Sequence, residues 1–257
     1  MSGKGYSVDL GLPTRGDGRG EGALPRVVGK AKPQSYYGQP ILNQPTWTWE
    51  IPTYFFFGGM SGASAVLALA AEERGNDVLA RRAWLVANLG IMVSPPLLIS
   101  DLGRPERFLN MMRVFKPTSP MSMGSWILAT AGSSFALAGA RSLLGWFPRL
   151  GRHAAVGSRF AGPAHSTNTA VLVADTAVPI WHEARTHLPF VFAAGASTSA
   201  AGAALVLTPS RHAGPARRLA LGAAVAELAA VHRMEHDLGE LGEPYHQGVA
   251  GRVARAA

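Results

Sequence analysis

The sequence predicts an all-α integral membrane protein, and three observations lead to this prediction. Hydrophobic residues make up 47% of the 257 residues and charged residues only 16%, whereas about a quarter of a soluble globular domain is charged. The apolar residues fall in successive runs, several of which approach the roughly 20 residues that a helix needs to cross a bilayer. Small residues dominate these runs and allow close helix packing within lipid. We therefore expect a transmembrane helical bundle of about six spans.

Two segments precede the expected bundle. Residues 1–35 are rich in Gly, Arg and Pro without an apolar period, which predicts a disordered basic tail. Residues 36–52 carry many aromatic residues and prolines, a composition typical of the membrane interface. The bundle is expected over 53–231, and residues 232–257 form a polar C-terminal segment.

The expected spans follow the apolar runs. The second is interrupted by Pro95 and Pro96. The fourth is weaker because only Thr169–Trp181 is strongly apolar and Asp175 lies in it, and the sixth contains Glu227. The expected ranges are 53–71, 83–100, 122–144, 163–181, 188–207 and 216–231.

Six spans place both termini on one face of the membrane, called here the first face. The opposite end of the bundle is called the second face. Loops 101–121 and 182–187 are expected on the first face. Loops 72–82, 141–160 and 208–215 are expected on the second.

A dense polar block follows the second expected span. Residues 100–110 read Ser-Asp-Leu-Gly-Arg-Pro-Glu-Arg-Phe-Leu-Asn, where lipid gives way to headgroups. Charge held at that depth is costly and usually functional. The block therefore predicts a site for a polar, redox- or proton-active ligand, with Asp101, Arg104 and Arg107 as its first candidates.

Three stretches of the chain resemble the NrfD/polysulfide reductase membrane-subunit family. The first joins Tyr36-Tyr37-Gly38 with Trp49-Glu50-Ile51-Pro52-Thr53-Tyr54-Phe55 and Gly58-Gly59. The second and most specific is Leu98-Ile99-Ser100-Asp101-Leu102-Gly103-Arg104-Pro105, continuing through Arg107-Phe108-Leu109-Asn110-Met111 to Phe115-Lys116-Pro117-Thr118-Ser119-Pro120-Met121-Ser122. The third is Asp175-Thr176-Ala177-Val178-Pro179-Ile180-Trp181-His182-Glu183-Ala184 with Leu188-Pro189. The resemblance covers roughly residues 36–250.

The resemblance implies a quinone-reactive membrane anchor of an iron–sulfur molybdoenzyme-type respiratory complex in the cell membrane. Such a subunit passes electrons between a ferredoxin-like iron–sulfur partner subunit and the quinone pool, with a catalytic oxidoreductase subunit beyond the partner. Menaquinone or ubiquinone is the implied bound substrate, and the redox centres belong to the partners. Members of the family usually have further spans, so we expect this chain, which ends at Ala257, to lack their last helices.

Quinone reduction consumes two electrons and two protons, so a site needs donors to the carbonyl oxygens and acids that relay protons. Asp101, Tyr54 and Glu50 are the catalytic candidates. Glu50 and Tyr54 lie one turn apart at the start of the first span, at the same depth as Asp101. Purely structural roles are the alternative: Asp101 would cap a turn, and Glu50 would be favoured by the helix dipole.

The remaining candidates bind the quinone or supply protons. Arg104, Arg107, Trp49, Trp126 and His182 are the candidate quinone-binding residues, although the tryptophans would also serve as lipid anchors. Asp175 and Glu227 are the candidate proton relay because acids within the membrane commonly mark proton pathways. Alternatively, each would pair with a polar residue on a neighbouring helix.

Other features argue against metal, haem and nucleic acid. The chain contains no cysteine, which excludes c-type haem attachment and Cys-ligated iron–sulfur clusters. We expect all eight histidines at span ends or in loops, whereas haem b needs histidine pairs at depth. The segment from His232 to His236 matches an inverted zinc-peptidase motif, but little chain follows to support a metal site. The net charge of +8 comes from arginines mostly in short loops, which favours the headgroups of a lipid bilayer over nucleic acid.

Two other functions stay open, a passive membrane anchor and an ion or solute transporter. A quinone site predicts that Glu50, Tyr54, Asp101, Arg107 and His182 gather around one pocket on the first face. Transport predicts that Asp175 and Glu227 converge near the bilayer midplane. A passive anchor predicts neither arrangement.

Overall fold

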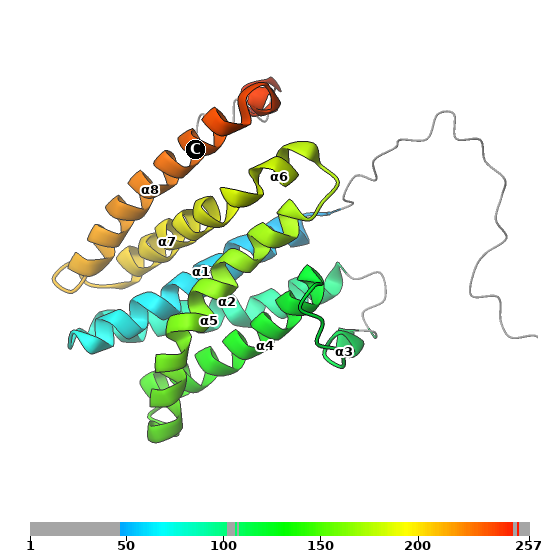
Figure 1. Ribbon diagram of the computed structural model, residues 1–257. Coiled ribbons are helices and arrows are strands. Elements are labelled where there is room, and N and C mark those ends of the chain that lie inside the picture. Colours follow the sequence, from blue (N-terminus) through cyan, green and yellow to red (C-terminus); the bar gives the residue numbers. More distant parts are fainter. Residues whose placement is uncertain (1–46, 102–105, 107, 249–250, 252–257) are drawn as a thin grey trace, which may run out of the picture. The chain divides into compact units, whose positions relative to one another are not determined.

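The computed structural model describes residues 47–101, 106, 108–248 and 251. The expected tail, residues 1–35, lies outside the described residues, as does most of the expected interfacial segment 36–52. Residues 42–257 form one compact unit, in which the described residues fold into helices joined by turns and loops and contain no strand (Figure 1). The long helices are α1 (Glu50–Glu73), α2 (Asp77–Ser100), α4 (Pro120–Gly139), α5 (Pro148–Ala174), α7 (Leu188–Leu207) and α8 (Gly214–Leu238).

Short helical turns connect the long helices. Helix α3 (Phe108–Met111) lies between α2 and α4, and helix α6 (Pro179–Glu183) lies between α5 and α7. A π-helical turn, Ala140–Leu144, extends α4, and 3-10 turns cover Ala184–Thr186 and Gly239–Tyr245.

Within the described part of the chain, four helices are long and apolar enough to cross a membrane. They are α1, α2, α4 with its π-helical extension, and α7. Helices α5 and α8, which cover the predicted fourth and sixth spans, fall short because polar and charged residues recur along both. The predicted all-α membrane bundle is confirmed.

The predicted boundaries of the fourth span, 163–181, were wrong. Helix α5 begins at Pro148 and ends at Ala174, with Asp175 as its C-cap, so much of the expected loop 141–160 is helical. Val178 is extended, and Pro179 begins α6. The residue before a proline is disfavoured in the helical conformation, which explains why one helix does not continue through Pro179.

The predicted interruption of the second span at Pro95 and Pro96 was also wrong, because α2 continues through both prolines to Ser100. Proline has no N–H to donate to the carbonyl one turn earlier. The carbonyls of Ile91 and Met92 therefore lose their usual helical donors. Ser94, beside the prolines, donates its hydroxyl to the Gly90 carbonyl at 2.8 Å.

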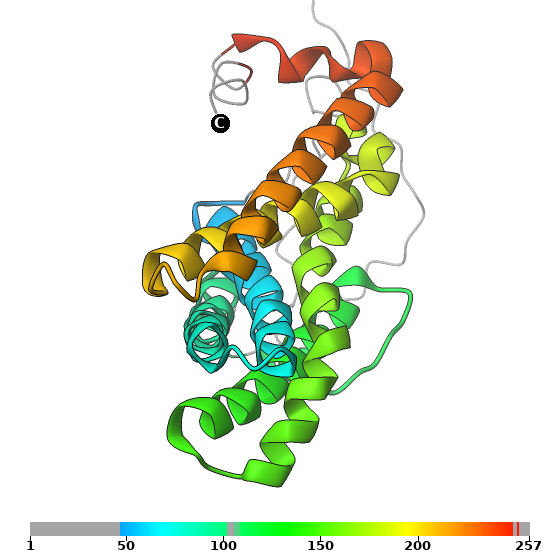
Figure 2. The same ribbon diagram turned by 90° about the vertical axis from the view of Figure 1, so that its left-hand side faces the viewer.

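Helix α1 packs against α2, α5 and α7 (Figure 2). At its crossing with α5, a Cβ on Gly162 would lie 2.7 Å from the Gly62 carbonyl oxygen, so only glycine allows this approach. The Ser166 hydroxyl donates to the Gly59 carbonyl at 3.0 Å nearby. Close backbone contact of this kind replaces the hydrophobic drive that lipid does not supply.

Helix α8 packs along α7. Near the first face, His187 Nε2 lies 3.2 Å from Asp237 Oδ2 and joins the start of α7 to the end of α8. Near the second face, Asn76 Nδ2 donates to the His212 carbonyl at 2.9 Å and joins the α1–α2 turn to the α7–α8 turn. Both ends of the helical hairpin are therefore fixed.

Candidate functional site

The first face brings two predicted carboxylates together. Helix α1 begins at Glu50 and the antiparallel α2 ends just before Asp101. The Thr48 hydroxyl bonds to the Glu50 carboxylate and lies 3.4 Å from Asp101 Oδ1. We call the side chains of Glu50, Thr48 and Asp101 the Thr48 bridge. Thr48 was not predicted, because a threonine before a helix resembles an ordinary cap.

Tyr54 lies beneath this bridge, one turn into α1. Its side chain is buried, with only 2% of the residue exposed, whereas Glu50 is half-buried. Tyr54 is therefore shielded from solvent while Glu50 remains within reach of it. The predicted one-turn spacing places the phenol and the carboxylate on the same side of α1.

Aromatic rings pack beside the bridge. Trp47 stacks on Trp181 of α6 with ring centroids 5.9 Å apart and planes 10° from parallel. Phe55 meets Trp47 edge-on at 5.8 Å and Phe192 of α7 at 5.9 Å. We call these four residues the first-face aromatic cluster. Trp47 and Trp181 were missed because isolated tryptophans near a span end resemble lipid anchors.

The other predicted quinone-binding residues are scattered. His182 is exposed on α6, with its Nδ1 3.2 Å from the Ala174 carbonyl. Trp49 is 68% exposed. Trp126 bonds to the Val114 carbonyl at 3.4 Å and lines a cavity of about 450 Å³ between α4 and α5. Arg104 and Arg107 lie outside the described residues.

The two predicted relay acids lie at different depths. Asp175 is exposed and ends α5 at the first face, so its predicted place inside a span was wrong. Glu227 precedes the end of α8 at Leu238 by eleven residues, about 16 Å of helix. Its Oε2 accepts a hydrogen bond from Thr198 of α7 at 3.1 Å. The convergence that a transport site requires is therefore not seen between Asp175 and Glu227.

Glu227 instead lines a cavity that reaches the aromatic cluster. This cavity of about 450 Å³ lies between α1, α5, α7 and α8, and both Phe55 and Phe192 line it. A Cβ on Gly195 of α7 would lie 3.0 Å from Glu227 Oε1, so the small residue leaves room for the carboxylate. The cavity connects a mid-helix acid with aromatic side chains of the first face.

The expectation that every histidine lies at a span end or in a loop was wrong, because His165 lies inside α5 and is fully buried. Neither ring nitrogen has a hydrogen-bond partner among the described residues. A Cβ on Gly58, one turn beyond Tyr54, would lie 3.3 Å from His165 Nε2. Asn168 Nδ2 and Thr169 Oγ1, about one turn nearer the first-face end of α5, are also buried without a partner within the described chain.

No group of three or more His, Cys, Asp or Glu residues that could hold a metal occurs among the described residues. In the zinc-peptidase-like motif, His236 Nδ1 lies 3.2 Å from Asp237 and Glu235 lies 3.9 Å from His246. These side chains are engaged in pairwise contacts.

Residues 40–140 match the family model described as "Polysulphide reductase, NrfD". The predicted NrfD resemblance is confirmed over this segment. The NrfD segment contains Glu50, Tyr54, Asp101 and Trp126, whereas Asp175, His182 and Glu227 follow it. A comparison with curated proteins gives no match. A match to this family model is typical of a membrane subunit of a molybdoenzyme-type complex.

Proposed function

We propose that this chain is the quinone-reactive subunit of a respiratory oxidoreductase complex in the cell membrane. It would pass electrons between a ferredoxin-like iron–sulfur partner subunit, itself bound to a catalytic oxidoreductase subunit, and the quinone pool. The NrfD match supports the assignment of the chain to such a complex, and the matched segment contains all three catalytic candidates. The chain has no cysteine, so any Cys-ligated cluster belongs to a partner, and no haem is proposed.

The Thr48 bridge is the observation that carries this proposal. A hydroxyl has one proton to donate but can also accept, so Thr48 cannot donate to Glu50 and Asp101 at once. A proton on either carboxyl group completes the bridge by donating to Thr48. The bridge can therefore hold one exchangeable proton between two acids from different helices.

The proposed reaction uses that proton store. Reduction of a quinone adds two electrons, from the partner's iron–sulfur cluster, and one proton to each carbonyl oxygen. Asp101 or Glu50 gives the one proton of the bridge to a carbonyl oxygen. The bridge then takes up a second proton from the relay groups and gives it to the other carbonyl oxygen. The Tyr54 hydroxyl donates a hydrogen bond to a carbonyl oxygen. Quinol oxidation runs the same transfers in reverse, with the carboxylates accepting the protons. Positioned acids contribute about 100-fold or more to such steps.

The quinone ring would lie between the Thr48 bridge and the first-face aromatic cluster, since stacked rings favour another planar ring. Arg104 and Arg107 follow Asp101 closely in the chain, and Trp49 and His182 would border the site. Trp126, on the α4–α5 cavity, would contact the isoprenoid tail.

Proton resupply would use the two predicted relay acids and His165. Glu227 lines the cavity that reaches Phe55 and Phe192, and Asp175 lies at the first-face end of α5. His165, whose ring lies against Gly58 one turn beyond Tyr54, joins the relay candidates.

Binding of a fluorescent hydroxyquinoline N-oxide, a quinone analogue, to the complex purified from membranes tests the proposal. Its fluorescence should be quenched saturably by the wild type, with binding weakened at least about tenfold by Asp101→Asn and Tyr54→Phe. Asp77→Asn is the matched control, because Asp77 lies at the opposite end of α2. It should bind like the wild type.

Two outcomes would overturn the proposal in different ways. Unchanged binding in Asp101→Asn and Tyr54→Phe would remove the residue assignment. If the wild type binds no analogue while its iron–sulfur partner still co-purifies, the chain is a passive anchor.

A further inference from the structure

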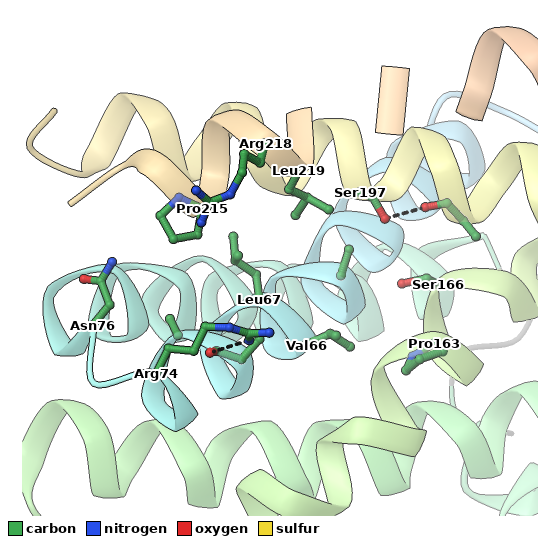
Figure 3. A pocket seen from close by; sticks show the side chains of 14 residues that line it. Val66, Leu67, Arg74, Asn76, Pro163, Ser166, Ser197, Pro215, Arg218 and Leu219 are labelled. Carbon is green, nitrogen blue, oxygen red and sulfur yellow. Dashed lines mark hydrogen bonds between the residues drawn. The ribbon is translucent and has the colours of Figure 1, made fainter. Parts of the chain in front are cut away.

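A groove at the second face has no part in the proposed quinone chemistry. It has a volume of about 470 Å³ and lies between α1, α5, α7 and α8. Its walls are mostly Ala, Val, Leu and Pro side chains, and no acidic residue is among those that line it. Figure 3 shows the groove with Arg74, the C-cap of α1, and Arg218 of α8 on opposite sides of it.

The interior of this groove offers no free side-chain hydroxyl donor to a ligand. Two serines line it, and both donate their hydroxyl protons elsewhere. Ser166 donates to the Gly59 carbonyl at 3.0 Å, and Ser197 donates to the Ala193 carbonyl at 2.8 Å. A ligand inside the groove therefore meets hydrocarbon rather than free hydrogen-bond donors.

The length of the groove matches one leaflet of a bilayer. Its α1 wall runs from Ala63 to Arg74, which is eleven residues or about 16 Å of helix. Half of a bilayer's hydrocarbon core is about 15 Å. Arg74 caps the end of the candidate span α1, so the cationic rim lies where headgroups begin.

Hydrogen bonds hold Arg74 and join the two turns that carry the cationic rim. Arg74 Nη1 donates to the Ala70 carbonyl at 3.1 Å, which leaves its other guanidinium donors for a ligand. The hydrogen bond from Asn76 to His212 ties the turn after Arg74 to the turn before α8. Arg218 lies in the first turns of α8 and is exposed.

We propose that this groove binds an anionic glycerophospholipid, with one acyl chain along α1 and the phosphate between Arg74 and Arg218. Charge complementarity selects the headgroup, because two guanidinium groups and no carboxylate line the groove. Guanidinium groups bind phosphate oxygens through paired hydrogen bonds. The site is independent of the Thr48 bridge, which lies at the other end of α1.

Lipid titration of the full-length protein, delipidated in a mild detergent, tests the site by native mass spectrometry. Dioleoylphosphatidylglycerol should bind saturably, and dioleoylphosphatidylcholine, with the same chains, should bind more weakly. Arg74→Gln and Arg218→Gln should each weaken binding of the anionic lipid about fivefold, the weight of one basic side chain at an anionic surface.

Two further variants separate this site from general attraction to the protein surface. Arg217→Gln removes the neighbouring exposed arginine, which does not line the groove, and should leave affinity within about twofold. Ala63→Phe fills the apolar end and should weaken binding of both lipids while both arginines remain. Thermal unfolding without lipid checks that each variant is folded.

Four results would overturn the proposal. Equal affinity for the two lipids would exclude selection by the arginines. If Arg217→Gln and Arg218→Gln weaken binding of the anionic lipid equally, the attraction comes from general surface charge and not from the groove. Competition by free glycerol phosphate at the affinity of the lipid would make it a soluble phosphate site. A protein dimer that excludes lipid would assign the groove to a second copy of the chain.

Discussion

The two ends of the helix pair α1 and α2 treat their carboxylates differently. At the second face, Glu72 pairs with Arg141 and accepts a hydrogen bond from Trp84 Nε1 at 2.7 Å, while Glu73 pairs with Arg159. At the first face, Glu50 and Asp101 share the hydroxyl of Thr48. Carboxylates are therefore neutralised by arginines at the second face and bridged by a neutral hydroxyl at the first face.

This difference separates a structural role from a chemical one. A carboxylate paired with arginine and bonded to a buried indole has its charge balanced and its lone pairs engaged, so its role is to connect helices. A carboxylate on a hydroxyl keeps further lone pairs for a proton or a ligand. The carboxylates of the second face would therefore stabilise the fold, and those of the first face would take part in the chemistry.

The largest expected effect concerns turnover at the first face. Glu50→Gln and Asp101→Asn should each slow quinone reduction by the intact complex about 100-fold. Because both acids share one bridge, the double variant should lose little more than either single variant, far short of the product of the two losses. Losses that multiply would mean that the two carboxylates act independently.

The next effect is on stability at the second face. Glu72→Gln should lower the free energy of unfolding by about 2 kcal/mol, because it leaves the half-buried Arg141 without its counter-charge. Glu73→Gln breaks a more exposed pair and should cost about 0.5 kcal/mol. Thermal unfolding in detergent measures both. A larger loss in Glu50→Gln than in Glu72→Gln would contradict the comparison between the two faces.

A smaller effect should come from the bridging hydroxyl itself. Thr48→Ala removes the shared group and should slow quinone reduction about tenfold, the weight of about one hydrogen bond to a charged group. Thr48→Ser keeps the hydroxyl and should restore most of the rate. If serine does not rescue the rate, the methyl group rather than the hydroxyl is what matters.

The smallest effect concerns a first-face carboxylate that does have cationic partners. His236, bonded to the carboxylate, holds the pKa of Asp237 below its usual 3.8, and Arg233 and His187 act in the same direction. A lowered pKa in the folded state stabilises the protein above the unfolded-state value and loses this contribution as the pH falls below about 4. Unfolding of wild type and Asp237→Asn between about pH 6 and 3 should show a smaller acid-dependent loss in the variant. The exposed Glu240→Gln, as a control, should keep the wild-type profile.

The sequence predicted the helices and the meeting of Glu50 with Asp101 because both depend on local information. Apolar runs of bilayer length define helices, and antiparallel neighbours bring the start of α1 to the end of α2. The end of α5 was misplaced because the apolar residues from Thr169 to Trp181 hid the break that precedes Pro179.

His165 and the aromatic cluster depend on packing between distant segments. Trp47 and Trp181 are far apart in the chain, and nothing local predicts that they stack. His165 did have a signal: Ser158, Gly162, His165, Thr169 and Val173 recur every three or four residues, and all are buried. This small and polar stripe marks the face of α5 that packs inward, but the low hydropathy of the segment obscured it.

The prolines of α2 have a mechanical consequence for the first face. With two consecutive backbone hydrogen bonds missing, the helix resists bending less at Pro95 and Pro96 than elsewhere along its length. Asp101 follows Pro96 by five residues, which is about 7 Å along the helix axis. A partner that pulls on the chain after Asp101 would therefore swing this carboxylate toward or away from Thr48 while the rest of α2 stays still.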